Sequence, residues 1–386
     1  MIRKITTDQL QVGMYIHRLV VGWLNNPFTS SKFLLKSKKD ILKIRDAGIK
    51  WIEIDTSKGI DTSLVKSVQS KAEVSIKQQT KSAKDEMETA KVAFEDARQF
   101  ISGVMNSAKM GQCVELEKVE PVIKDLSDSI LRNENALLGL THIRNMDYYT
   151  FEHSVSFSVL MMSFAKGMGK SDEFICAVGI GGLLHDIGKT ITPDHILNKP
   201  GKLTPEEFVI MKEHVVHSRI ILEKTVGLSQ ISMDVAAMHH EKYDGNGYPL
   251  GLNKDQISLA GQMAAIVDVY DALTADRCYH KGKKPSDALQ FLLEGSGSHF
   301  NPQLVQQFIQ SVGIYPTGSV VLLNNDYLAT VIEIKDNMLK PIVEIFFNTK
   351  TKQNVPTELI DLSTSTDLKV KNVDSYENWN IKPLIA

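Results

Sequence analysis

The stretch Ile180-Gly-Gly-Leu-Leu-His185-Asp186-Ile-Gly-Lys189 places a histidine and an aspartate directly after an apolar helical run. The apolar residues predict a packed helix, which carries both polar side chains into the interior. A buried carboxylate or imidazole costs several kcal/mol unless it is hydrogen-bonded or coordinated. A divalent metal supplies that coordination, and one aspartate can bridge two ions. The stretch therefore predicts a metal site at His185 and Asp186, with Asp186 as the bridge.

Histidine and aspartate also recur on neighbouring segments. Nine of the eleven histidines lie between residues 150 and 300. The motif His239-His240-Glu241 ends an apolar helix, where two adjacent histidines, about 100° apart around the axis, can still reach one ion or a pair. Asp268 and Asp271 share one face of a further apolar helix and require a metal or a buried cation there. A single core histidine is more often a hydrogen-bonding residue, but this combination indicates a metal site.

The segment around these residues has helical spacing from Cys113 to about Val312, which predicts an all-α domain. One helix start is well marked. Thr204 is its expected N-cap, Pro205 occupies the first helical position, and Glu207 completes a capping box. The helix that follows carries His214 and His217.

The composition changes along the chain and predicts four parts in a multi-domain, mainly α protein. Residues 1–61 alternate short apolar runs with turn formers, which predicts a small α/β or mostly-β module. Residues 62–140 form a helical linker, through which two copies could pair as a homodimer. Residues 141–315 are predicted to be the all-α domain that carries the metal site, and residues 316–386 have the alternation of a short β extension.

The totals set limits on the class of protein. Apolar residues make up 42% and charged residues 23% of the 386 positions, as in ordinary globular proteins. A net charge of −2 gives no indication of a surface for duplex nucleic acid. The start of the chain lacks the apolar core of a signal peptide, and no apolar stretch suggests a membrane span. Three widely spaced cysteines without a CxxC pair favour a reducing cytoplasm; they are Cys113, Cys176 and Cys278.

Three motifs, taken in order, resemble the signature of the HD-GYP subfamily of HD-domain phosphohydrolases. They are His185-Asp186-Ile-Gly-Lys189, His239-His240-Glu-Lys-Tyr-Asp-Gly-Asn-Gly247-Tyr248-Pro249 and Asp268-Val-Tyr-Asp271-Ala-Leu-Thr-Ala-Asp276-Arg277. The similarity covers about residues 145 to 315, and the N-terminal stretch resembles the small domain often found ahead of HD-GYP domains. The resemblance implies an HD-type helical fold and a bacterial enzyme that opens cyclic di-GMP with two or three iron or manganese ions.

The resemblance also implies the metal ligands, position by position. His214 occupies the ligand position of its helix, because His217 stands where the family usually has an apolar residue. Members with a third metal carry a glutamate where this chain has Tyr149, which favours a site for two ions, iron or manganese. Asp271 or Asp244 is expected to orient a ligand imidazole. The implied ligands are His153, His185, Asp186, His214, His239, His240 and Asp268, with Asp186 bridging the ions.

The expected chemistry is hydrolysis of a phosphodiester by a water that the two ions activate, first to the linear dinucleotide pGpG and then to GMP. Asp186 and Lys189 are the expected catalytic residues. Lys189 could neutralise a bound phosphate, although a lysine at a helix end also interacts with the helix dipole. Ser218, Lys242 and His280 differ from the residues usual in the family and leave substrate preference open. The expected substrate contacts are Lys189, Gly247, Tyr248, Pro249, Arg277 and His280.

Three alternatives remain open from the sequence. The same chemistry could act on a mixed GMP-AMP cyclic dinucleotide or on a nucleotide monoester. A catalytically silent module could instead bind a dinucleotide, or a signalling protein through the Gly-Tyr-Pro loop, but the complete ligand set argues against silence. A di-iron oxygenase is the third alternative, and Lys189 together with the Gly-Tyr-Pro loop favours phosphoester chemistry over it.

Overall fold

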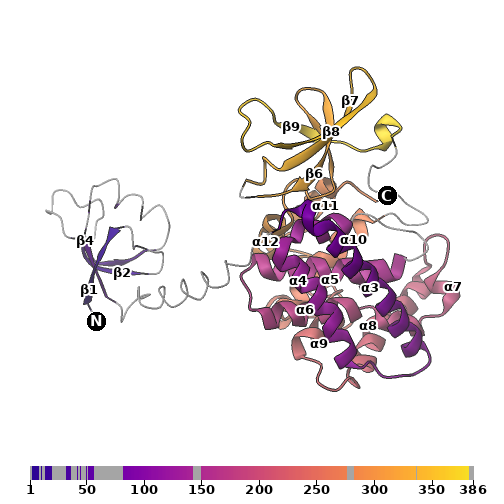
Figure 1. Ribbon diagram of the computed structural model, residues 1–386. Coiled ribbons are helices and arrows are strands. Elements are labelled where there is room, and N and C mark those ends of the chain that lie inside the picture. The colour runs from indigo at the N-terminus through magenta and orange to yellow at the C-terminus, as the bar shows by residue number, and fades with distance from the viewer. Residues whose placement is uncertain are drawn as a thin grey trace. The chain divides into compact units, whose positions relative to one another are not determined.

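The computed structural model describes residues 81–141, 149–275, 282–335 and 337–381, and short stretches within residues 2–55, namely 2–7, 10, 14–19, 32–35, 41, 44, 49 and 51–55. The chain divides into two compact units, residues 1–79 and residues 80–386 (Figure 1). The predicted mainly α fold, with small strand regions near both ends, is confirmed.

The first unit contains a four-stranded antiparallel sheet in the order β1-β4-β2-β3. Alternate residues of a strand point to the same face, so Ile52 and Ile54 are buried together against Ile16 and Met14. The strands are β1 (Ile2–Thr6), β2 (Tyr15–Leu19), β3 (Phe33–Leu34) and β4 (Trp51–Asp55).

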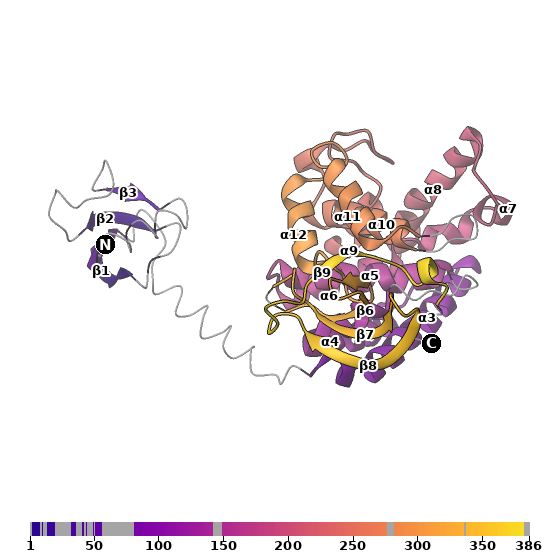
Figure 2. The same ribbon diagram turned by 90° about the horizontal axis from the view of Figure 1, so that it is seen from above.

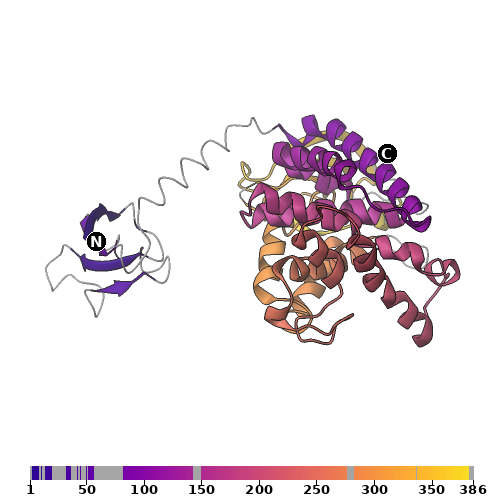
Figure 3. The same cartoon turned by 90° about the horizontal axis from the view of Figure 1, so that it is seen from below.

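The second unit begins with a body of helices that share one hydrophobic core. Figure 3, seen from below, shows the helices in front, whereas the C-terminal sheet lies above them in Figure 1. The elements are α3 (Ala83–Lys109), α4 (Leu116–Leu140), α5 (Tyr149–Gly167), α6 (Asp172–Leu184), η4 (Ile187–Ile191), α7 (Asp194–Leu197), α8 (Pro205–Leu222), α9 (Gln230–Met238), η5 (Lys254–Gln256), α10 (Leu259–Thr274), α11 (Pro285–Glu294) and α12 (Pro302–Val312).

The helices α3 and α4 fall in the segment for which the sequence predicts a linker. Both are helical, but Ala97 and Ile101 of α3 and Ile123 and Ile130 of α4 are buried in the same core as α5 and α6. The apolar positions on α3 recur at helical spacing among many charged residues, so one narrow stripe is enough to bury the helix. The described part of the predicted linker is therefore a component of the main helical unit.

A five-stranded antiparallel sheet follows the helices, in the order β8-β7-β6-β5-β9 (Figure 2). A break in α4 connects it to the helical body. Asn133 has extended backbone angles there, and the side-chain oxygen of Asn135 accepts hydrogen bonds from the Thr317 hydroxyl and the Ile334 amide. The strands are β5 (Val320–Leu323), β6 (Tyr327–Glu333), β7 (Ile342–Asn348), β8 (Gln353–Asp361) and β9 (Val370–Val373).

One segment, Asp172–Ile191, has the length and mean hydropathy, 1.3, of a membrane-spanning helix, which the sequence pattern alone does not predict. Of its most apolar window, 67% is buried inside the protein. The segment comprises α6 and η4, and it carries His185 and Asp186 into the interior. A helix in the middle of a protein core has this composition too, and we assign the segment to the core.

Candidate metal centre

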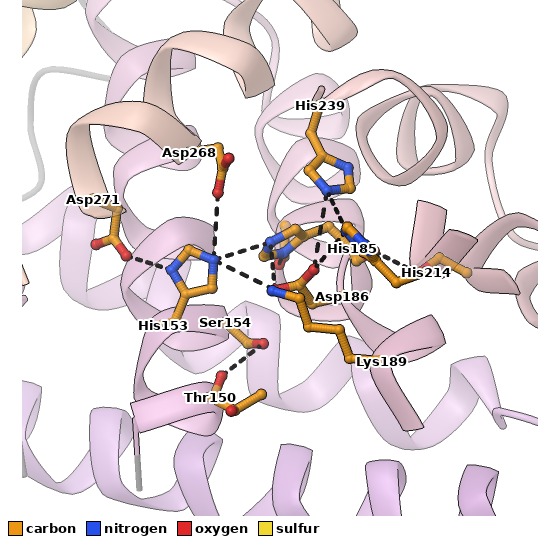
Figure 4. Close-up of polar contacts among 12 residues, drawn as sticks. Thr150, His153, Ser154, His185, Asp186, Lys189, His214, His239, Asp268 and Asp271 are labelled. Atoms are coloured by element: carbon orange, nitrogen blue, oxygen red, sulfur yellow. Dashed lines mark hydrogen bonds and ion pairs between the residues drawn. The ribbon is translucent and has the colours of Figure 1, made fainter. Parts of the chain in front are cut away.

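Three helices and the ends of two others bring the predicted ligands to one place (Figure 4). His153 comes from α5, and His214 comes from α8. His185 and Asp186 follow the last residue of α6, while His239 and His240 follow the last residue of α9. Asp268 comes from α10. Residues separated by more than a hundred positions in the chain thus converge on a common centre.

The turn after α6 packs closely against the backbone of α8, and this packing orients the side chains of His185 and Asp186. A β-carbon added to Gly188 would lie 2.0 Å from the carbonyl oxygen of His214, so only glycine fits there. The Ser218 hydroxyl donates to the carbonyl of His185 at 2.7 Å and accepts from the Gly188 amide at 2.8 Å. Ser218 stands where the resembled family usually has a glycine. Its two hydrogen bonds stabilise this turn.

Each of the four most buried imidazoles has its Nδ1 atom hydrogen-bonded away from the centre. His185, His214 and His239 donate to the backbone carbonyls of the residues three positions earlier, at 2.7, 2.6 and 2.9 Å. His153 donates instead to the Asp271 carboxylate at 2.5 Å. A carbonyl oxygen can only accept, so Nδ1 of His185, His214 and His239 carries a proton, which leaves Nε2 as the ring atom available to a metal. The Nε2 atoms face the centre as metal ligands require.

Asp186 lies between two sets of imidazoles. Its Oδ2 atom is 3.3 Å from Nε2 of His185 and 3.5 Å from Nε2 of His153. Its Oδ1 atom is 3.4 Å from Nε2 of His214 and 3.9 Å from Nε2 of His239. Each carboxylate oxygen therefore faces one set, which is the arrangement of a carboxylate that bridges two ions.

The potential ligand atoms form three overlapping groups whose members lie within 4.8 Å of one another: His153, His185 and Asp268; His185, Asp186 and His239; and His214, His239 and His240. All seven predicted ligands occur in these groups. His240 also approaches Asp268, with 3.4 Å between Nδ1 and Oδ2. The groups share members, as expected for two adjacent ions rather than for separate sites.

Two observations show that the residues fit a metal. Oδ1 of Asp186 is buried and has no hydrogen-bond partner among the described residues. Two pairs of Nε2 atoms face each other, at 3.2 Å between His185 and His153 and at 3.4 Å between His214 and His239. On the neutral rings of His214 and His239 the facing lone pairs repel unless a cation lies between them. A cation coordinated at this centre would satisfy all of these atoms.

Burial and charge keep the ligands in the protonation states that a metal needs. Burial lowers the pKa of His214 to about 3 and also holds the pKa of His239 well below its usual value, so both rings are neutral at pH 7. Burial favours a raised pKa for Asp186, but the neighbouring His185 and Lys189 side chains outweigh it and hold that pKa well below normal. The centre therefore offers neutral imidazoles at His214 and His239 and an ionised carboxylate at Asp186.

The ammonium of Lys189 forms an ion pair with the carboxylate of Asp186. Its Nζ atom is 2.5 Å from Oδ2 of Asp186, and its side chain is 24% exposed. The Lys189 side chain is therefore partly exposed to solvent, while its ammonium reaches the buried carboxylate of Asp186. This position suits a cation that stabilises a phosphate bound beside Asp186.

Glu241 is a candidate positioning residue, to which the sequence analysis assigned no role. It is buried, and its carboxylate accepts hydrogen bonds from the amides of Leu250 at 2.8 Å and Leu252 at 3.0 Å. A β-carbon on Gly247 would lie 2.5 Å from Cα of Glu241, so the loop packs against the backbone beside the ligand histidines. Tyr248 lies over His240, with 4.7 Å between ring centroids. In the sequence, the only indication of this role is that Glu241 directly follows the two histidines.

We expect Glu241→Gln to lower catalytic efficiency about tenfold to a hundredfold while metal content stays that of the parent protein. The amide keeps one acceptor oxygen but turns an NH₂ group toward the second backbone amide, which displaces the loop. Steady-state kinetics and metal analysis would check this, with the exposed Glu88→Gln as the matched control. A Glu241 variant with the kinetics of the Glu88 variant would contradict the positioning role.

Some predicted site residues are not brought to the centre or cannot be placed. Arg277, His280 and the side chain of Tyr149 lie outside the described residues. His217 is in none of the ligand groups of the described chain. The Asp244 carboxylate accepts from the Asn246 amide at 3.0 Å within its own loop, so of the two expected orienting carboxylates it is Asp271 that contacts an imidazole.

The chain matches two known families. Residues 128–304 match the family described as HD domain, and residues 2–119 match a domain of unknown function, DUF3391. The second match extends through α3 to the start of α4.

Similar proteins agree with these matches. "Cyclic di-GMP phosphodiesterase PA4108" of Pseudomonas aeruginosa is 36% identical over 394 residues, which cover 100% of this chain and 95% of that protein. "3'3'-cGAMP-specific phosphodiesterase 2" of Vibrio cholerae is 43% identical over 128 residues, 33% of this chain and 24% of that protein. A solved structure, Bd1817, a HDG"Y"P protein from Bdellovibrio bacteriovorus, superposes with a TM-score of 0.50 at 18% identity, over 80% of this chain and 99% of that one. That structure supports the fold alone.

Proposed function

Because this chain belongs to the HD-GYP subfamily of HD-domain phosphohydrolases, we propose that it is a metal-dependent phosphodiesterase that hydrolyses cyclic di-GMP. The products are linear pGpG and, after a second cleavage, GMP. The observation that carries this proposal is the position of Asp186, whose two oxygens each face a separate set of imidazoles. A bridge of this kind is typical of centres that cleave phosphodiesters with two ions.

We propose two ions, iron or manganese, held by His153, His185, Asp186, His214, His239, His240 and Asp268. Imidazole and carboxylate ligands suit either metal. Divalent ions bound here supply a water of lowered pKa and neutralise charge on the phosphate.

The residues of the chain supply orientation and charge. The Nδ1 hydrogen bonds hold the imidazoles with Nε2 directed inward. Lys189 can move its ammonium from Asp186 to an equatorial oxygen of the phosphate as the attacking water displaces the ribose oxygen. Glu241 holds the Gly-Tyr-Pro loop, so that Tyr248 borders the cleft beside His240.

The test is hydrolysis by the full chain, purified without oxygen and loaded with iron(II) or manganese. We expect conversion of cyclic di-GMP to pGpG and GMP, and loss of conversion after chelation. Protein that retains two equivalents of metal and binds the dinucleotide without turnover would overturn the proposal in favour of a silent binding module.

A second substrate is a mixed GMP-AMP cyclic dinucleotide. Relatives that carry the printed name of cGAMP-specific enzymes match this chain at 43% identity over 128 residues and 38% over 157 residues, which favours including it. Comparing kcat/KM for the two dinucleotides on the same preparation decides between them. The full-length similarity to the protein from Pseudomonas aeruginosa favours cyclic di-GMP.

The surroundings of the enzyme are part of the proposal. We place it in the cytoplasm, where a cyclic dinucleotide messenger is made and degraded. The buried stripe of α3 is already used in the protein's own core, so a homodimer through α3 and α4 would need other faces of these helices. Signalling proteins could contact the exposed end of the Gly-Tyr-Pro loop, where Leu250 is 63% exposed.

A further inference from the structure

Phe208 and Lys212 form a surface beside the metal centre that no motif accounts for. They lie four residues apart on α8, so their side chains share one side of this helix. The same helix also carries His214. The capping box between Thr204 and Glu207 fixes the first turn, immediately before Phe208. Their positions are therefore determined by a rigid element, and Figure 2 shows α8 at the edge of the helical body.

Phe208 is a large aromatic side chain that is 48% exposed. Its ring lies 6.4 Å from the ring of Tyr248 and almost perpendicular to it, at 81°. Tyr248 in turn lies over the ligand candidate His240, with 4.7 Å between centroids. The aromatic surface thus runs from His240 through Tyr248 to the exposed ring of Phe208.

Lys212 adds a positive charge to this surface. Its Nζ atom is 5.4 Å from the centroid of Phe208 and 5.7 Å from the centroid of Tyr248. Within the described chain it forms no ion pair with a carboxylate, and its ammonium lies over the two ring faces. A cation held this way is free to turn toward a ligand, because its four-carbon stem is flexible.

We propose that Phe208, Lys212 and Tyr248 form a guanine-binding subsite, a proposal that rests on the phosphodiesterase function proposed above. The base stacks on Phe208 and replaces the ammonium over the ring, as bases commonly do on exposed aromatic side chains. The Lys212 ammonium then donates to O6 and N7 of guanine. Adenine presents a donor at the position of O6, so Lys212 favours guanine over adenine.

Binding of three small probes to the manganese-loaded full chain tests this directly. The probes are GMP, AMP and ribose 5-phosphate, and their dissociation constants are measured by calorimetry. We expect Phe208→Leu to weaken GMP and AMP about tenfold each and to leave ribose 5-phosphate unchanged, because only the stacking surface is lost. Phe208→Trp should restore binding. Lys212→Met should weaken GMP about tenfold and leave AMP unchanged.

Matched controls are available elsewhere on the surface. Phe291→Leu removes a phenylalanine that is 39% exposed on α11, and Lys224→Met removes an exposed lysine beyond the end of α8. Equal GMP affinity in the Phe208 and Phe291 variants would overturn the subsite, as would an equal loss of ribose 5-phosphate binding.

Turnover separates this proposal from the proposed function. Wild-type protein that binds GMP through Phe208 but hydrolyses no cyclic dinucleotide would overturn the phosphodiesterase function and leave the subsite standing. Wild-type protein that hydrolyses cyclic di-GMP, with a KM that neither variant changes, would overturn the subsite alone. If both proposals are correct, KM for cyclic di-GMP rises in both variants and kcat stays near that of the parent.

Discussion

Asp186→Asn is expected to lower the turnover of cyclic di-GMP by at least about 10³-fold and to reduce bound metal from two equivalents to less than one. The amide keeps the size of the side chain but loses the charge and one of the two oxygens that face the imidazole sets. Without the Asp186 carboxylate, one ion would keep only His153, His185 and Asp268 as ligands, and the other only His214, His239 and His240. Metal analysis and initial rates on the same preparations would check both effects.

The matched control is Asp194→Asn. Asp194 also has a histidine next to it in the chain, His195, but its side chain is 70% exposed and pairs with Lys109 on the surface. Circular dichroism of both variants would show whether the helices are retained. Full activity with two bound metals in the Asp186 variant would contradict the assignment of the centre.

Lys189→Met is expected to lower kcat about 10²-fold to 10³-fold and to leave metal content equal to or above that of the parent. Lys189 is not a ligand, and its charge lies 2.5 Å from the oxygen that a metal would coordinate. Removing the ammonium therefore reduces repulsion of the incoming cation while it removes a charge from the phosphate. Turnover therefore falls while metal binding is kept or strengthened. A lysine with a purely structural role would lower both.

Lys124→Met provides the control, because Lys124 forms a comparable ion pair with Asp128 at 2.6 Å on the surface, where its side chain is 71% exposed. We expect the parent's kinetics from it. Parallel loss of metal and of turnover in the Lys189 variant would show that this residue maintains the centre instead of acting on substrate.

The sequence was sufficient for properties that depend on local pattern. The helical domain followed from apolar spacing, and the start of α8 followed from Thr204, Pro205 and Glu207, which form the predicted capping box. The seven proposed ligands were named from motifs and resemblance, and the structure brings all seven together. Buried polar residues in apolar helices are a strong signal, because they need a partner wherever they are placed.

The tertiary structure decided what depends on contacts between distant segments. The sequence left Asp271 and Asp244 as equal candidates for orienting an imidazole, and only the packing of α10 against α5 places Asp271 on His153. The roles of Glu241 and Ser218 likewise come from backbone amides and carbonyls that the chain's fold delivers to them. Backbone partners leave no trace in residue identity, so no motif announces them.

The same distinction applies to the linker and to the bridge. Charged composition predicted a helical linker over residues 62–140, but a stripe that includes Ala97 and Ile101 is enough to bury one face of α3 in the core. The sequence alone indicated Asp186 as a bridge. Only the fold determined that its Oδ2 faces α5 and the end of α6, while its Oδ1 faces α8 and the end of α9. Residue type fixes which chemistry a side chain can perform, and three-dimensional packing fixes which partners it meets.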